Sequence, residues 1–201
     1  MVSIIEYGMG NVASVEKALA FLKIPCITTA DHELIEKSDA IILPGVGSFE
    51  QGMKNLSERN LITFLTDQVI GKKKKFLGIC LGMQLIVTDG EEPVDNPGLG
   101  WVKGRVTRIR VQNLRVPHMG WNNISVTDKG TYFKDAAHKD FYFIHSYHFI
   151  PDDKNVIAAT VNYGTDLVAA VQQDNIFATQ FHPEKSQEAG LALLKSFLNY
   201  A

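Results

Sequence analysis

Short apolar runs alternate with helix-period segments through the first half of the chain. The apolar runs cover residues 2–7, 24–29, 39–43 and 75–80, and they have the length and character of strands buried in a parallel sheet. Between them, apolar residues recur at helical spacing over 12–22 and 53–69, where Gly71 ends the second pattern. This alternation predicts an open parallel sheet with helices on both faces.

The second half of the chain has a different pattern. β-type runs separated by turn residues cover 102–111, 123–126, 141–144, 156–161, 167–171 and 176–181, and a last helix is expected over 187–200. We expect these strands to be antiparallel additions to the sheet. The prediction is an α/β fold of three layers with an open, mixed but mostly parallel sheet. Because no repeat, low-complexity tract or linker divides residues 1–201, a single domain is expected.

Composition and charge limit the cellular compartments and the classes of partner to be expected for this chain. The chain has 201 residues, is 45% hydrophobic and carries a formal net charge of -2, so it can bury a sizeable core and gives no electrostatic argument for nucleic-acid binding. The run Lys72 to Lys75 is interpreted as a solvated loop. No apolar run approaches membrane-spanning length, and Glu6 lies where a signal peptide would be apolar or basic, so a cytoplasmic protein without a membrane partner is expected. The two cysteines, Cys26 and Cys80, have neither disulfide nor zinc-ligand spacing; no metal is expected, and Cys26 is predicted to be core.

Cys80 has the sequence context of an enzyme nucleophile. Gly78-Ile79-Cys80-Leu81-Gly82 follows an apolar strand and is the cysteine form of the G-x-S-x-G elbow, a sharp strand-to-helix turn. Glycines two positions away on each side leave room where sheet and helix close in on the strained nucleophile. The amide end of the following helix would favour a thiolate. The alternative is a buried free cysteine between two packing glycines.

A glycine motif near the N-terminus suggests a different function. Gly8-Met9-Gly10-Asn11-Val12-Ala13 follows a strand and opens a helix, and Asp31 lies 21 residues beyond Gly10, as in a dinucleotide-binding fingerprint. The elbow on another strand of the same sheet favours a second interpretation, a tight turn beside an active site.

The partners of a cysteine nucleophile are a base and a group that orients the base. His182 and Glu184 are two residues apart after an apolar strand, so in an extended segment they share a face, and Pro183 is expected to keep the segment extended. His182 would then exchange a proton with Cys80 while Glu184 fixes its tautomer. A structural histidine is the alternative.

Two backbone N–H groups are needed to stabilise the oxyanion that forms on the substrate. Leu81, directly after the nucleophile, supplies one, and the Val46-Gly47 part of the loop Pro44-Gly45-Val46-Gly47 is expected to supply the other. An ordinary strand-ending turn is the alternative for this loop.

Together these motifs resemble a known family. P-G-V-G, G-I-C-L-G-M-Q and F-H-P-E-K-S occur here in the order and spacing of the class I triad glutamine amidotransferases, and the similarity runs from about residue 4 to 198. Three further runs resemble the glutaminase subunits of imidazole glycerol phosphate synthase of the bacterial separate-chain type. They are Tyr7-Gly8-Met9-Gly10-Asn11, Val116-Pro117-His118-Met119-Gly120-Trp121-Asn122 and His145-Ser146-Tyr147.

The resemblance implies an activity, partners and site residues. Such a subunit hydrolyses L-glutamine to glutamate and ammonia through a thioester on the matching Cys80, uses no cofactor, and passes ammonia to a (β/α)8-barrel cyclase subunit of histidine biosynthesis in a heterodimer. The positions that match glutamine-binding residues are Gly47, Gln84, Glu92, Ser146 and Tyr147. Those that match the cyclase-facing surface are Asn11, Met119, Trp121 and Lys185.

Two departures from the family pattern leave the ammonia acceptor open. Residues 86–92 replace an aromatic and serine-rich run, and His148 stands where a tyrosine is common. One alternative is therefore a paralogous glutaminase subunit that feeds a sugar amidotransferase of surface polysaccharide synthesis. Two further hypotheses are a catalytically silent regulatory subunit, which the intact triad argues against, and a nicotinamide-dependent oxidoreductase.

Overall fold

The computed structural model describes residues 1–134 and 139–199. Its helices are α1 (Val12–Phe21), α2 (His32–Glu36), α3 (Phe49–Glu58), α4 (Leu61–Thr66), α5 (Leu81–Leu85) and α6 (Gln187–Asn199). Its strands are β1 (Val2–Ile5), β2 (Cys26–Thr29), β3 (Ala40–Gly45), β4 (Lys75–Cys80), β5 (Asp89–Gly90), β6 (Asn96–Pro97), β7 (Gly104–Arg108), β8 (His118–Asn123), β9 (Ser125–Val126), β10 (Asp140–His145), β11 (Tyr147–Pro151), β12 (Ile157–Asn162), β13 (Asp166–Gln173) and β14 (Ile176–Thr179). The described part of the chain contains no helix long and apolar enough to cross a membrane.

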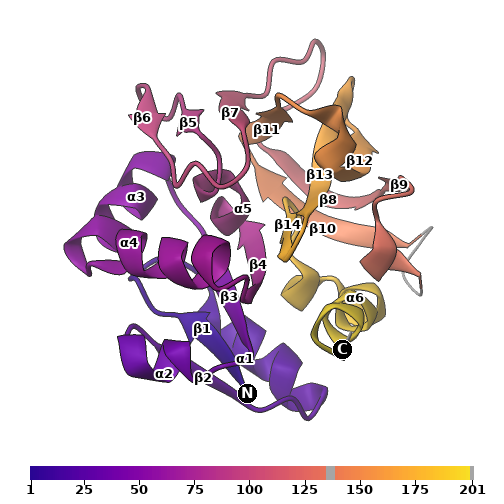
Figure 1. The fold of residues 1–201 in the computed structure, drawn as a ribbon. Helices are drawn as coiled ribbons and strands as arrows, with labels where there is room; N and C mark the ends of the chain where they lie inside the picture. The colour runs from indigo at the N-terminus through magenta and orange to yellow at the C-terminus, as the bar shows by residue number, and fades with distance from the viewer. Residues whose placement is uncertain (135–138, 200–201) are drawn as a thin grey trace.

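A mixed sheet forms the centre of the described residues (Figure 1). Its order is β2-β1-β3-β4-β14-β13-β12-β9. The strands from β2 to β14 run parallel, and β13, β12 and β9 continue antiparallel. The register pairs Gly45 with Cys80 and Thr179 with Ile79. Because parallel strands end at the same edge, the segments after β3, β4 and β14 leave the sheet side by side.

Helices cover both faces of this sheet, which confirms the predicted three-layer α/β fold. On one face, Leu19 of α1 and Phe197 of α6 share a buried cluster with Leu77 of β4. On the other face, Leu56 of α3 and Leu65 of α4 share a second cluster with strand residues of the sheet. Side-chain caps start the helices on this framework: the Asn11 side chain accepts from the Ser14 N–H, and Ser48 and Asp31 do the same for α3 and α2.

The strands of the second half are arranged differently from the prediction. β14 enters the centre of the sheet in parallel, not antiparallel. β10 pairs with β8 in a separate two-stranded sheet, and β7 pairs with β11 and β5 in a four-stranded sheet with β6. The strand over 118–123 has no counterpart in the prediction, because polar residues and Gly120 dilute its pattern. Hydrophobic periodicity marks a strand but leaves its pairing partner undetermined, so the separate sheets could not be predicted.

Several local predictions also need correction. The helical pattern over 53–69 is divided between α3 and α4, because Asn60 adopts a left-handed conformation (φ 56°), and a wide π-type turn follows over 67–71. The lysine run is not simply solvated: the Lys74 ammonium donates to the carbonyl oxygens of Ile35, Glu36 and Ser38. Cys26 is half-buried against the core instead of fully enclosed.

Candidate active site

Cys80 occupies a strained turn between β4 and α5. Its backbone has φ 54° and ψ -105°, a region that side chains with a Cβ rarely adopt. The two neighbouring glycines allow this turn. A Cβ on Gly82 would overlap the carbonyl oxygen of Leu43, and a Cβ on Gly78 would lie 2.8 Å from the carbonyl oxygen of Gly82. The geometry is that of an elbow, as predicted.

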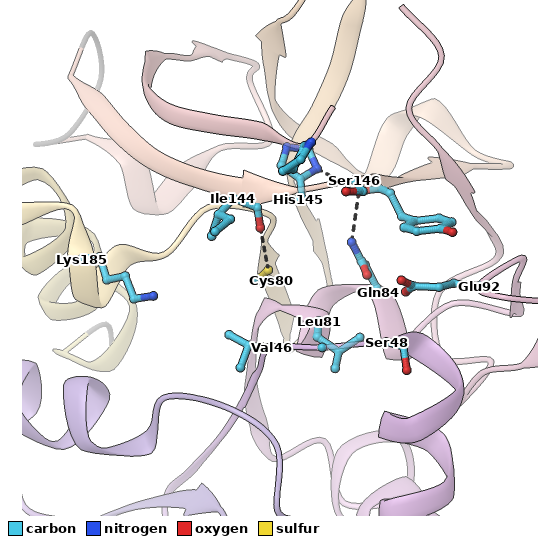
Figure 2. Close-up of a pocket in the computed structure, with 13 residues that line it drawn as sticks. Val46, Ser48, Cys80, Leu81, Gln84, Glu92, Ile144, His145, Ser146 and Lys185 are labelled. Carbon is cyan, nitrogen blue, oxygen red and sulfur yellow. Dashed lines mark hydrogen bonds between the residues drawn. The ribbon is translucent and has the colours of Figure 1, made fainter. Parts of the chain in front are cut away.

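A cavity of about 500 Å³ opens in front of this turn (Figure 2). The loop after β3 forms one wall, α5 forms the floor, and residues 144–147 lie across the opposite side. Nine residues singled out from the sequence line it: Val46, Gly47, Cys80, Leu81, Gln84, Glu92, Ser146, Tyr147 and Lys185. A pocket of this size suits an amino-acid substrate.

His182 and Glu184 lie behind the cysteine and are buried. The distance from His182 Nδ1 to Glu184 Oε1 is 2.7 Å, and each side chain is 2% exposed. The predicted extended segment is wrong, because residues 183–185 form a 3-10 turn with Pro183 at its first position. Proline is tolerated there because the first N–H of a helical turn needs no partner within it. The turn, instead of an extended backbone, brings the two side chains together.

The ring of His182 interacts with both Glu184 and Cys80. Burial alone would lower the pKa of His182, but interactions with the Cys80 sulfur and the Glu184 carboxylate outweigh burial and raise it to about 9. Among the described residues, Nε2 has no partner that meets full hydrogen-bond geometry, and the Cys80 sulfur is the largest of the influences that raise the pKa of His182. An imidazolium at neutral pH beside the cysteine follows from this arrangement.

Gln180 is a site residue that the sequence patterns did not single out. It is fully buried, and its Nε2 lies 3.7 Å from the Cys80 sulfur. A signal exists in the sequence, because Gln180 and His182 are two residues apart at the end of an apolar strand and can share a face. That spacing is the same one that predicts a shared face for His182 and Glu184.

The loop after β3 lies next to the elbow, as expected for an oxyanion-binding loop. Gly47 has φ 114°, and a Cβ there would lie 2.7 Å from the Met9 methyl carbon. Val46 is 41% exposed and lines the cavity beside Leu81 (Figure 2). Burial, followed by the charge of Cys80, raises the pKa of the Tyr7 hydroxyl beneath this loop.

The residues expected to bind substrate surround the mouth of the cavity. Gln84 is buried and donates through Nε2 to the Tyr147 carbonyl oxygen at 3.1 Å. Glu92 Oε2 accepts the Phe49 N–H at 3.0 Å. Burial raises the pKa of Glu92, while that hydrogen bond and the charge of Arg108 act in the opposite direction. Figure 2 shows Glu92 and Ser146 on the side of the cavity that Gln84 faces.

The N-terminal glycine motif forms a turn packed against the oxyanion loop. Gly10 has φ 114°, and a Cβ there would lie 3.0 Å from the Pro44 carbonyl oxygen. The Asp31 carboxylate accepts the Leu34 N–H at 3.0 Å and so caps α2. This geometry supports a tight turn beside the active site and gives no support to the dinucleotide interpretation.

The residues expected at a partner surface lie on neighbouring elements beside the cavity. Met119 and Trp121, both on β8, are 59% and 47% exposed. Trp121 packs edge-on against Tyr142 of β10, with ring centroids 5.9 Å apart. Lys185 lines the cavity, and Asn11 lies at the start of α1, which packs against the turn over 183–185. Within residues 1–134 and 139–199, no cluster of three or more His, Cys, Asp or Glu side chains is arranged to hold a metal ion.

Comparisons with known proteins agree with this geometry. The family model "Glutamine amidotransferase class-I" matches residues 4–200. Imidazole glycerol phosphate synthase subunit HisH of Pelagibacter ubique is 42% identical to this chain, covering 98% of this chain and 99% of its own length. The subunit of the same name from Geobacter sulfurreducens is 43% identical, with 98% and 97% covered.

Solved structures share the fold at lower identity. A glutamine amidotransferase crystal structure superposes with a TM-score of 0.77 at 21% identity and covers 99% of this chain and 98% of its own. The structure of PurLQS from Thermotoga maritima gives a TM-score of 0.72 at 21% identity, with 99% and 97% covered. The chain therefore belongs to the class-I glutamine amidotransferases and, within them, to the family of imidazole glycerol phosphate synthase subunit HisH.

Proposed function

We propose that this chain is the glutaminase subunit of imidazole glycerol phosphate synthase. It hydrolyses L-glutamine to glutamate and ammonia in the cytoplasm and passes the ammonia to a cyclase subunit for histidine biosynthesis. Residues 1–201 form one glutamine amidotransferase domain in this proposal. The observation that carries it is the 2.7 Å contact between His182 and Glu184 behind the Cys80 elbow, in a chain 42% identical over its full length to HisH subunits.

The chemistry follows from the positions of these groups. The Cys80 thiolate attacks the side-chain amide carbon of glutamine, and the carbonyl oxygen becomes an oxyanion that the N–H groups of Leu81 and the Val46-Gly47 segment stabilise. His182 gives its proton to the amide nitrogen as the carbon–nitrogen bond breaks, which releases ammonia and leaves a γ-glutamyl thioester on Cys80. His182 then takes a proton from water, and the resulting attack releases glutamate and restores the thiolate. Glu184 keeps the imidazole oriented throughout.

The remaining site residues bind substrate and partner. Gln84, Glu92, Ser146 and Tyr147, with Gly47, surround the part of the cavity that would hold the amino and carboxylate groups of glutamine. The exposed Met119 and Trp121, with Asn11 and Lys185, form the surface for a (β/α)8-barrel cyclase in a heterodimer. Trp121 is the best anchor among them, because large aromatic side chains carry much of the binding energy at interfaces.

A second candidate keeps the chemistry and changes the acceptor. Two HisH subunits of Methanococcus maripaludis, numbered 1 and 2, are each 42% identical to this chain, so identity does not distinguish between copies of this subunit. Together with the departures over residues 86–92 and at His148, this favours testing a paralogue that feeds a sugar amidotransferase.

Glutaminase turnover in three mixtures tests both candidates. The subunit is assayed alone, with an imidazole glycerol phosphate cyclase, and with that cyclase plus its nucleotide substrate. Strong stimulation in the third mixture is expected, because ammonia made without an acceptor is wasted. Failure to bind the cyclase, combined with stimulation by a sugar amidotransferase, would establish the second candidate. No glutamine hydrolysis with any partner would overturn the proposed activity.

A further inference from the structure

Gln180 is placed to act on the reacting sulfur. Its side chain is fully buried and contacts both Gln84 and Cys80, with its Nε2 3.7 Å from Cys80 Sγ, within the range of a hydrogen bond to sulfur. Sγ also lies 3.9 Å from the carbonyl oxygen of Ile144. Only a protonated thiol can donate to that carbonyl, so the interaction is lost when the proton leaves.

The orientation of the Gln180 amide is fixed by its neighbours. Gln84 Nε2 lies 3.1 Å from the carbonyl oxygen of Tyr147 and 3.0 Å from Gln180 Oε1. A backbone carbonyl only accepts, so the Tyr147 oxygen must face the NH2 group of Gln84. That NH2 group in turn requires an oxygen from Gln180. The NH2 group of Gln180 is therefore the end that faces the sulfur.

Two buried histidines hold the same carbonyl from the other side. His145 Nδ1 lies 2.8 Å from the Tyr147 oxygen and must donate to it, which leaves Nε2 as an acceptor for His118 Nδ1 at 3.0 Å. Burial lowers the pKa of His145 to about 3 and that of His118 to about 4, so both rings are neutral at pH 7. Each hydrogen bond from His118 to the sulfur then has a defined donor and acceptor, and the Tyr147 oxygen accepts from both His145 and Gln84.

We propose that Gln180 donates an N–H to the Cys80 thiolate and holds the sulfur in position for attack on the substrate. Gln84 and the Tyr147 carbonyl act as positioning groups that keep the Gln180 nitrogen toward the sulfur. The thiolate thus has two partners, the imidazolium of His182 and the neutral amide of Gln180. The inference rests on the proposed function, because it takes Cys80 as the nucleophile.

Reactivity of Cys80 toward iodoacetamide tests the inference without glutamine or a partner. Two variants are compared with the unchanged protein. Gln180→Met removes both polar ends at similar length and without charge, and Gln180→Glu keeps an oxygen for Gln84 but removes the N–H toward sulfur. The rate of alkylation is measured between pH 6 and 10 by mass spectrometry of the Cys80 peptide, with the Cys26 peptide of the same molecule as internal reference.

A lost hydrogen bond to a charged atom should slow Cys80 alkylation at pH 7 by roughly tenfold in Gln180→Met and move the midpoint of the pH profile upward. Gln180→Glu should show at least as large a shift. The control Gln172→Glu changes the net charge equally on β13, away from the cavity, and should leave the profile unchanged.

A wild-type alkylation profile in a folded Gln180→Met or Gln180→Glu protein would overturn the inference. If one variant fails to fold by circular dichroism, the other decides. The outcome is separate from the proposed function: an unshifted profile together with glutamine hydrolysis by the unchanged protein would remove only the role of Gln180. A shifted profile in a protein that hydrolyses no glutamine would retain the contact and remove the proposed activity.

Discussion

His182 Nδ1 lies 2.7 Å from Glu184 Oε1, although the two residues are separated by a single proline. Both side chains are almost completely buried, and the other ring nitrogen faces the Cys80 sulfur. A carboxylate in this position fixes the ring tautomer and stabilises the imidazolium without itself transferring a proton. The contact therefore assigns different duties to His182 and Glu184, which mutation can separate.

Cys80→Ala should abolish glutamine hydrolysis and leave the fold intact, because a small side chain fits the elbow while the nucleophile is lost. Steady-state glutaminase assays and circular dichroism measure the two effects. An electrophilic glutamine analogue should label Cys80 and spare Cys26, which lies half-buried on β2. Substantial turnover by the variant would refute the assignment. Labelling of Cys26 instead of Cys80 would show that Cys26 is the reactive thiol.

His182→Ala should lower kcat more than Glu184→Gln. The first change removes the proton donor for the leaving ammonia, whereas the second leaves an imidazole that is present but poorly oriented. General acid–base catalysis by a side chain contributes roughly 10²- to 10⁴-fold, which sets the expected loss for His182→Ala. The reverse order of damage in parallel kcat measurements would contradict the roles assigned here.

Gly82→Ala should destabilise the protein by more than about 3 kcal/mol, because the new Cβ would overlap the backbone carbonyl of Leu43 and neither element can easily move. Denaturant unfolding measures the change. Gly71→Ala is a matched control, since its Cβ would meet the end of the Asp67 side chain, whose Oδ1 would lie 3.2 Å away, and no backbone atom of another segment within 4 Å. Equal stability of the two variants would show that the elbow is not closely packed against β3.

Gly47→Ala should reduce glutaminase activity far more than stability. The φ of 114° is unfavourable for a residue with a Cβ, so the loop would shift and displace the N–H expected to bind the oxyanion. Loss of one such donor costs roughly 10²- to 10³-fold in kcat. Turnover should be measured with the partner present, and an unchanged kcat would remove this loop from the oxyanion hole.

Acidification should destabilise the protein through His145. Burial lowers its pKa to about 3, whereas an unfolded histidine titrates near 6.5. Below pH 6.5 His145 binds a proton in the unfolded chain, whereas in the folded chain it stays neutral until the pH approaches 3. The stability linked to this group is therefore complete above pH 6.5 and falls by about 1.4 kcal/mol per pH unit as the pH drops toward 3.

Denaturant unfolding at pH 7 and pH 5 measures this effect. His145→Gln should lose less stability between the two pH values than the unchanged protein does. His32→Gln, on the exposed part of α2, controls for removing a histidine. An equal loss in the unchanged protein and in His145→Gln would show that His145 is protonated in the folded state.

The parallel half of the fold and the chemistry at the elbow can both be predicted from the amino-acid sequence. The strands at 2–5, 26–29, 40–45 and 75–80 are predictable because buried strands in an α/β sheet are short, apolar and separated by helix-period segments. Gly78 and Gly82, two positions on each side of Cys80, predict the strained turn because they leave room where sheet and helix close in on the nucleophile. These are properties of neighbouring residues, so a single sequence contains them.

The contacts between segments far apart in the chain become visible in the folded structure alone. The parallel insertion of β14 beside β4, the separate sheets of β7 and β10, and the hydrogen bonds from His118 to Cys80 all join segments far apart in the chain. Their formation depends on pairing and register, which hydrophobic periodicity leaves open. Gln180 became a site residue for this reason: its spacing from His182 indicates a shared face, and the packing of β14 against β4 brings its amide to the sulfur.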